Sequence, residues 1–286
     1  MKEKFSQLLR NKGIMVFIAF LVVGFALLAG YFLPEGVDWS STFRPAALAV
    51  ITGKNPYKLP IEAPYAGAPW GMLPLAPFAF LPEWIGRGFL FTGSLLAFAY
   101  AAYRLRASSL AIIFFLLSPP VMHSLINANL DWMPLIGYSL PPSIGLFFLA
   151  VKPQMGIVVA VFWLVEAWRS GKWLSVIKTF GPVGIVFLIS LALYGFWPLN
   201  MLKVDAHTTW WNASLWPMSI PVGLALGVAA IRLRKIQYAM AASPCLSPHV
   251  VFHSWSAALI AIVSSTPETI AAVIGLWILV IIRAIS

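Results

Sequence analysis

The feature that most constrains this sequence is a series of apolar stretches long enough to cross a lipid bilayer. The first runs from about Ile14 to Leu33, roughly the 20 residues that span a hydrocarbon core at 1.5 Å per residue. Hydrophobic residues fill 60% of the 286 positions and charged residues only 10%, too few for the charged shell of a soluble domain. The sequence therefore predicts an all-α, polytopic integral membrane protein of about ten helical segments, forming one domain over residues 1–286.

The charge pattern argues against nucleic-acid binding. The net charge is +10, but the cations cluster at the ends of apolar stretches, and no basic run is interleaved with aromatic residues. We therefore expect membrane lipid, and no nucleic acid, as a partner. The single cysteine, Cys245, permits neither an internal disulfide nor a cysteine metal site. His249 and His253 have the spacing of two metal ligands on one helical face, but no third ligand is placed by spacing, so we expect no metal and no cofactor.

The positions of the cations predict the topology. They form four groups, spaced as if every second loop faces the cytoplasm: Lys2, Lys4, Arg10 and Lys12; Arg104 and Arg106; Arg169, Lys172 and Lys178; Arg232, Arg234 and Lys235. The positive-inside rule then places the amino terminus in the cytoplasm of a cell-membrane protein. The first apolar stretch is longer than a signal-peptide core, so we expect a retained helix. The long first loop, residues 34–70, and the segments 127–131, 152–154, 200–216 and 247–253 are predicted to lie together on the extracytoplasmic side.

A pair of prolines divides one apolar region into two short pieces. Trp132–Leu140 and Ser143–Val151 flank Pro141-Pro142, and each is about 15 Å long as a helix, half a bilayer. They form either a re-entrant hairpin or two tilted short helices. Irregular backbone at that depth must be shielded by protein or line a wet cavity. We therefore expect a polar cavity near the outer leaflet.

Three charged residues near the predicted outer surface have both structural and chemical interpretations. Asp38 can act as a general base toward a hydroxyl, or it can cap a helix, because the stretch Phe43–Thr52 looks helical and amphipathic. Arg44 can bind a phosphate bidentately or extend to the lipid headgroups. Asp131 is either a second acid in the cavity or the N-cap of the helix that begins at Trp132.

Several short motifs occur along the chain in a particular order. An acid, Asp38, and a short helix are followed by Gly53-Lys54-Asn55-Pro56-Tyr57, and Asn127-Ala128-Asn129-Leu130-Asp131-Trp132 comes next. Val151-Lys152-Pro153-Gln154 and finally Ser243-Pro244, with His249 beyond it, complete the series. This order resembles the GT-C class of membrane glycosyltransferases, and more narrowly the bacterial polyprenyl-phosphate-mannose-dependent mannosyltransferase family. The resemblance covers most of the chain through short motifs.

The resemblance implies a GT-C-like fold and an inverting transfer of a hexose, with mannose as the family's sugar, from a polyprenyl-phosphate donor to an acceptor on the extracytoplasmic face. It assigns the catalytic base to Asp38, an active-site role to His249, and a position facing the donor to Lys152. Other polar residues of the same loops are candidates for substrate binding: Arg44, Asn55, Tyr57, Asn127, Asp131, Gln154 and His253.

Two further functions remain open at the level of sequence. The chain is shorter than a typical member of that family, which leaves room for a non-catalytic GT-C-like subunit within a larger membrane-protein complex. The broken segment at Pro141-Pro142 also suits a transporter of small molecules or lipids, because such proteins bind substrate between half-helices.

Overall fold

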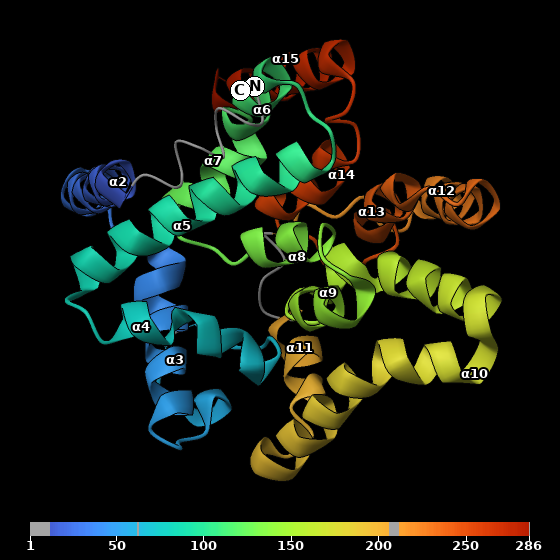
Figure 1. Cartoon of the computed structure of the whole chain (residues 1–286), viewed down its shortest axis with the longest axis horizontal. Helices are drawn as coiled ribbons and strands as arrows, with labels where there is room; N and C mark the ends of the chain where they lie inside the picture. Colours follow the sequence, from blue (N-terminus) through green and yellow to red (C-terminus); the bar gives the residue numbers. More distant parts are fainter. Residues whose placement is uncertain (1–11, 62, 206–211, 286) are drawn as a thin grey trace.

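The computed structural model describes residues 12–61, 63–205 and 212–285, and these residues are almost entirely helical (Figure 1). The longer helices are α2 (Lys12–Phe32), α5 (Glu83–Arg104), α10 (Pro153–Tyr194), α12 (Ile220–Leu233), α13 (Ile236–Cys245) and α15 (Thr266–Ile285). The shorter ones are α3 (Arg44–Ile51), α4 (Ala76–Ala79), α6 (Ser109–Leu116), α7 (Pro119–Ile126), α8 (Trp132–Gly137), α9 (Pro142–Leu149), α11 (Pro198–Asp205) and α14 (Ser256–Ile260). The all-α prediction is confirmed for the described part of the chain, where the one β-bridge joins Asn212 and Val251.

Four of the described helices are long and apolar enough to cross a membrane: α2, α5, α10 and α15. A fifth candidate is the pair α6 and α7, which is bent by 58° at Ser118-Pro119 because proline disfavours a helical conformation in the residue before it. The first span, Gly13–Phe32, agrees with the predicted apolar stretch. A total of about ten membrane segments stays a prediction. The cations at positions 2, 4 and 10, and residues 206–211 of the predicted outer segment, lie outside the described residues.

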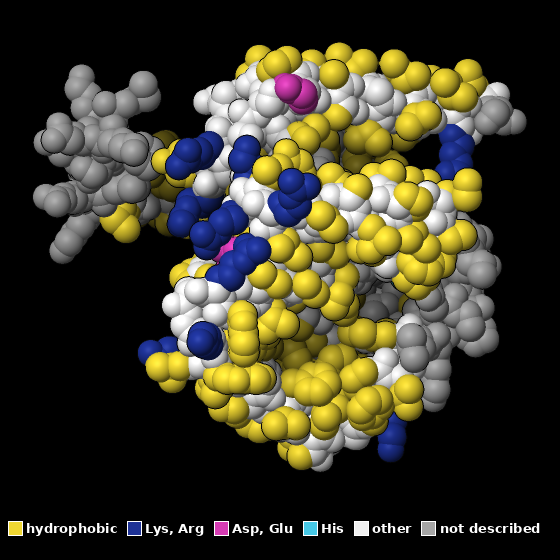
Figure 2. All heavy atoms as spheres, turned by 90° about the vertical axis from the view of Figure 1, so that its right-hand side faces the viewer, with side chains coloured by type: hydrophobic (Ala, Val, Ile, Leu, Met, Phe, Trp, Pro, Cys, Tyr) yellow, Lys and Arg dark blue, Asp and Glu magenta, His cyan; other side chains and the backbone are white. Residues whose placement is uncertain are grey.

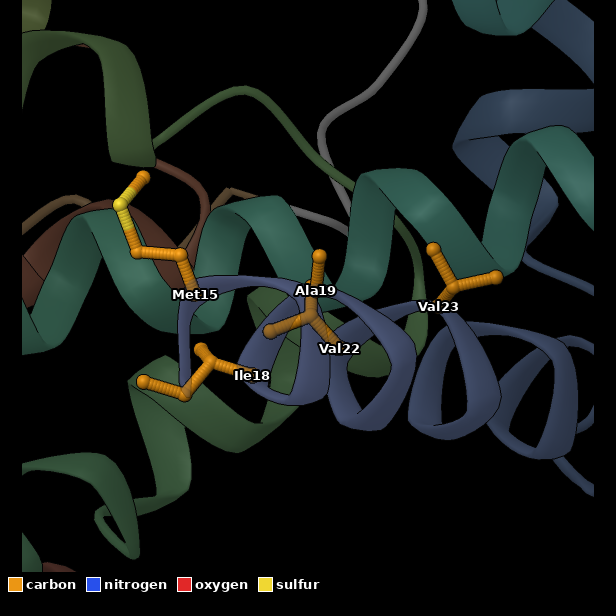
Figure 3. Close-up of a pocket in the computed structure, with 5 residues that line it drawn as sticks. All are labelled: Met15, Ile18, Ala19, Val22 and Val23. Carbon is orange, nitrogen blue, oxygen red and sulfur yellow. The ribbon is translucent and has the colours of Figure 1, made fainter. Parts of the chain in front are cut away.

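α2 has little protein around it. Its strongest contact is with α5, where Gly88 lies so close to the Ala26 carbonyl that an added Cβ would come within 2.0 Å of that oxygen. The rest of α2 is apolar and uncovered. Figure 3 shows Met15, Ile18, Ala19, Val22 and Val23, all from α2, around a shallow hollow of ≈ 320 Å³. Such a surface is typical of a helix that contacts lipid chains.

α10 consists of two helices joined by a sharp bend. The backbone leaves helical geometry at Gly171 and Lys172, and Figure 1 shows the two arms of α10 running beside one another from this bend. The first arm packs on α9 and α13. The first arm places the bend about 27 Å from Pro153, at 1.5 Å per residue.

The two short helices around Pro141 form a tight hairpin. α8 ends at Gly137 and α9 begins at Pro142, and the two glycines at their contact, Gly137 and Gly145, have no room for a side chain. An added Cβ on Gly145 would lie 2.5 Å from the Gly137 carbonyl oxygen. The predicted division at the proline pair is confirmed. Whether the hairpin is re-entrant stays a prediction.

Candidate functional site

The end of α2 is fixed by a buried arginine before the chain reaches Asp38. Arg87 of α5 donates hydrogen bonds to the carbonyls of Gly30 (2.5 Å), Leu33 (2.7 Å) and Pro34. These oxygens lack helical partners because α2 ends here. Gly36 follows, and a Cβ at this position would meet Arg87, Ala128 and the Asn127 carbonyl at 3.1–3.4 Å. The chain therefore passes through a narrow gap directly before Asp38.

Asp38 does not cap a helix, although it precedes the five-residue π-helix Trp39–Phe43. Its side chain makes no capping hydrogen bond. Instead, its Oδ2 accepts a hydrogen bond of 2.5 Å from Nδ2 of Asn129, which lies 91 positions later in the chain. The capping interpretation of Asp38 is therefore wrong. The carboxylate is partly exposed, and it is connected to the turn that follows α7.

Asn129 is positioned by the preceding residue in this turn, whose backbone has the left-handed conformation. α7 ends at Ile126, and Ala128 has φ of 54°, which lets the Asn129 amide donate to the Ser124 carbonyl at 2.9 Å. This is the usual geometry of a helix C-terminus. The Asn129 side chain then makes contacts in several directions: Nδ2 to Asp38 and, at 3.2 Å, to His253 Nε2, and Oδ1 to the ammonium of Lys152.

Asp131 is the centre of the buried part of the cluster and has no exposed surface. Oδ1 accepts hydrogen bonds from Lys152 Nζ (2.7 Å) and Ser254 Oγ (3.0 Å). Oδ2 accepts one from Ser124 Oγ (2.8 Å) and lies 2.6 Å from His253 Nδ1. It makes no capping hydrogen bond to α8, so its capping interpretation is also wrong. Burial raises the pKa of this carboxyl, but the charges and hydrogen bonds of His253 and Lys152 outweigh burial, and its pKa lies well below the usual range.

His253, from the short helix Phe252–Trp255, contacts the carboxylate of Asp131 directly. Its ring is buried and stacks on the ring of His123 from α7, with centroids 5.5 Å apart and planes 19° from parallel. His249, to which the resemblance assigned the active-site role, lies four residues earlier in a turn where its carbonyl accepts a hydrogen bond from Ser247 Oγ. The adjacent Val250 amide bonds Asn212 Oδ1.

Of the other predicted substrate-binding residues, several have local partners. Arg44 donates to the Leu81 carbonyl at 3.4 Å. Asn55 accepts a hydrogen bond from the Tyr57 amide, and the Tyr57 hydroxyl bonds the Gly67 carbonyl at 2.7 Å. These contacts are structural. Asn127 donates to the His123 carbonyl at 2.9 Å, next to the cluster, and Gln154 is partly exposed in the first turn of α10.

The sequence interpretation missed three side chains of the cluster: His123, Ser124 and Ser254. His123 is exposed, and together with Asp38 it forms the accessible end of the cluster. A signal was present, because His123, Ser124 and Asn127 form a polar patch within one turn of an otherwise apolar helix. The serines each donate to Asp131, and short hydroxyl side chains of this kind have no distinctive sequence pattern.

An apolar groove of ≈ 300 Å³ lies beside the buried end of the cluster. It includes Met133, two residues after Asp131, and Val151, next to Lys152. Residues from the segment before α4, from α9 and from α10 complete the lining: Trp70, Gly71, Leu73, Pro74, Phe147, Phe148 and Val186. The lining is almost entirely apolar, so its chemistry suits a hydrocarbon chain better than a polar ligand.

The described residues contain no group of three or more His, Cys, Asp or Glu side chains that could hold a metal ion. Comparison with protein-family models, with curated proteins and with solved structures finds no match to this chain. The arrangement of the cluster is therefore the main evidence on function.

Proposed function

We propose that this protein is a GT-C-like membrane glycosyltransferase that moves a hexose, such as mannose, from a polyprenyl phosphate to an acceptor hydroxyl on the extracytoplasmic face. The observation that carries the proposal is the partly exposed carboxylate of Asp38, held by Asn129 at the end of a buried ionic cluster. A general base needs a fixed position and access to substrate, and Asp38 has both. The apolar groove beside the cluster suits the hydrocarbon tail of the donor.

In the proposed reaction, the acceptor oxygen attacks the anomeric carbon of the sugar while its proton moves to Asp38. The bond between that carbon and the phosphate oxygen breaks, and polyprenyl phosphate leaves as a monoester with one additional negative charge. Inversion follows from a single displacement. His123, at the accessible end of the cluster, can donate a hydrogen bond to the developing phosphate charge.

The structure changes the role that we propose for Lys152. Lys152 is 9% exposed, and its ammonium bonds Asn129 and Asp131, so its charge is neutralised within the protein. We therefore propose that Lys152 and His253 orient Asn129, which in turn orients Asp38. The donor phosphate then relies on cations closer to the surface.

The test is Asp38→Asn, assayed with a radiolabelled polyprenyl-phosphate hexose in reconstituted vesicles that contain a crude acceptor fraction. The amide has nearly the same size but cannot take the acceptor's proton, so transfer should fall by about 10² to 10⁴. The matched control is Glu35→Gln, which neutralises an exposed carboxylate in the same loop and should transfer at the wild-type rate. Wild-type transfer by Asp38→Asn would remove the proposed base.

A second candidate function is a non-catalytic subunit, because Lys152 and His253, the basic side chains beside Asp131, already contact its carboxylate within the protein. Under this alternative, the sole role of the cluster is to hold four segments of the chain together. The wild-type protein then transfers no sugar and binds no polyprenyl phosphate, and Asp38→Asn changes at most the stability of the protein through its contact with Asn129.

A further inference from the structure

Three exposed cations of this protein lie at turns where the backbone favours glycine. Among the described non-glycine residues, positive φ occurs at Arg106 (67°), Lys172 (49°) and Arg234 (54°), and otherwise only at Ala128. The left-handed conformation brings the Cβ of an L-residue too close to the backbone and is unfavourable for it, whereas glycine adopts it without that penalty. Each of these turns ends a helix or a helical arm: α5, the first arm of α10, and α12.

These turns lie at the end of the molecule away from the buried cluster. α5 starts near Arg87, which holds the chain ahead of Asp38, and Arg106 follows its other end. The first arm of α10 starts beside Lys152 and ends at Lys172, about 30 Å away at 1.5 Å per residue. α12 reaches the same end, because Arg234 binds Glu166 at 2.5 Å and Arg169 donates to the Ile231 carbonyl.

Figure 2 shows many of the Lys and Arg side chains that are visible from this side gathered along one edge of the molecule. We call this the basic edge and define it by the exposed cations of the three turns and their neighbours: Arg104, Arg106, Arg169, Lys172, Arg232, Arg234 and Lys235. Glu166 lies among them and is bound by both Arg169 and Arg234. The edge therefore carries a large excess of positive charge.

Exposed Tyr and Trp residues near two of these turns indicate that the basic edge lies at the level of the lipid headgroups. Tyr100 and Tyr103 precede the turn at Arg106, and Trp168 and Trp173 flank the bend at Lys172. All four rings are at least 43% exposed, although their apolar bodies would be expected in the core of a soluble protein. Tyr and Trp rings with one apolar and one polar end concentrate at the level of lipid headgroups.

From these observations we infer that the basic edge binds the phosphates of anionic phospholipid headgroups. The cations stand at headgroup depth, exceed the acidic side chains available to pair with them, and occupy backbone positions that glycine would hold at lower cost. Juxtamembrane Lys and Arg are attracted to anionic lipid in this way. A different explanation is that they only complement the carbonyl ends of the helices, which cations also stabilise.

The test compares the melting midpoint of the full-length protein in two kinds of nanodisc. One is made of neutral phosphatidylcholine, and the other contains about one third phosphatidylglycerol, an anionic lipid of the kind that polybasic surfaces attract. The wild type should melt at a higher temperature with the anionic lipid. The variant Arg106→Gly with Lys172→Gly should lose at least half of that gain. In neutral lipid it should melt at or above the wild-type temperature, because glycine relieves both left-handed positions.

The matched control removes two exposed cations from the first loop, Lys54→Ala with Lys58→Ala, and should keep the full gain. Inorganic phosphate added to neutral nanodiscs should produce no gain, since the inference names a lipid headgroup. A glycine variant that retains the wild-type gain overturns the inference. A glycine variant that melts equally far below the wild type in both lipids overturns it as well and supports the helix-end explanation.

Discussion

Two clusters, each built around one carboxylate with two basic partners, occupy different environments in this protein. Asp131 lies between Lys152 and His253, and Glu166 lies between Arg169 and Arg234. The Asp131 side chain is 0% exposed and the Glu166 side chain 24%, while their ion-pair distances are similar. Geometry alone therefore does not separate them. The difference lies in the solvent, because removing a charge from a dry site leaves its partners without compensation.

The largest expected effect comes from Asp131→Asn, which leaves the ammonium of Lys152 buried without its counter-charge. Breaking a buried pair in this way costs about 3–5 kcal/mol of unfolding free energy. Chemical unfolding in detergent micelles measures it. The matched change at the exposed cluster, Glu166→Gln, should cost only a small fraction of that amount, since surface pairs are solvated. Equal losses from the two variants would show that both clusters are effectively wet.

The second effect is the response of the buried cluster to acid. The pKa of Asp131 in the folded protein lies below its unfolded value of about 3.9. A carboxyl of this kind contributes stability that is fully present above the unfolded pKa and is lost as pH falls through the folded pKa. The difference in stability between wild type and Asp131→Asn should therefore stay constant from pH 7 to pH 5 and shrink below pH 4. Unfolding of both proteins across this pH series is the measurement, and a difference that already disappears near pH 6 contradicts the assignment.

The smallest expected effect concerns salt. Salt screens interactions between exposed charges at separations beyond the Debye length, which falls from about 10 Å at 0.1 M to about 3 Å at 1 M. The loss of stability in Glu166→Gln should largely vanish at 1 M sodium chloride, while the loss in Asp131→Asn should persist. Melting curves of the two variants and the wild type at both salt concentrations separate these outcomes. A salt response as large for Asp131→Asn as for Glu166→Gln would remove the contrast between the clusters.

Most of the fold prediction rested on the spacing of apolar residues and on the lengths of the apolar stretches. The apolar stretch at Ile14, the short helix after Phe43 and the break at Pro141 all depend on residues close in sequence, and each is found in the structure. The first apolar stretch ends within a residue of its predicted end. The sharp bend of α10 at Gly171 and Lys172 falls within the third group of cations, where charge rather than periodicity predicted a loop, and the lone glycine is only a weak signal for its exact position.

Residue type alone could not decide the role of either aspartate. Asp38 and Asp131 both stand before helices, where aspartate is a common cap, and only the fold reveals partners 91 and 122 positions away. The choice between His249 and His253 also depended on a short helix that presents one imidazole inward. The functional roles of these residues stay predictions until the Asp38→Asn experiment is done.

The clasp of Arg87 on the end of α2 has a consequence for biosynthesis. A guanidinium one turn into an apolar helix is unfavourable in lipid unless hydrogen-bond acceptors are supplied, and here the acceptors are carbonyls of a different helix. α5 is therefore poorly suited to enter the bilayer by itself. α2 exposes apolar side chains along most of its length, so it can be stable in the bilayer before α5 joins it. We expect the nascent chain to hold α2 near the translocation machinery until α5 emerges, so that the two helices leave it as a pair.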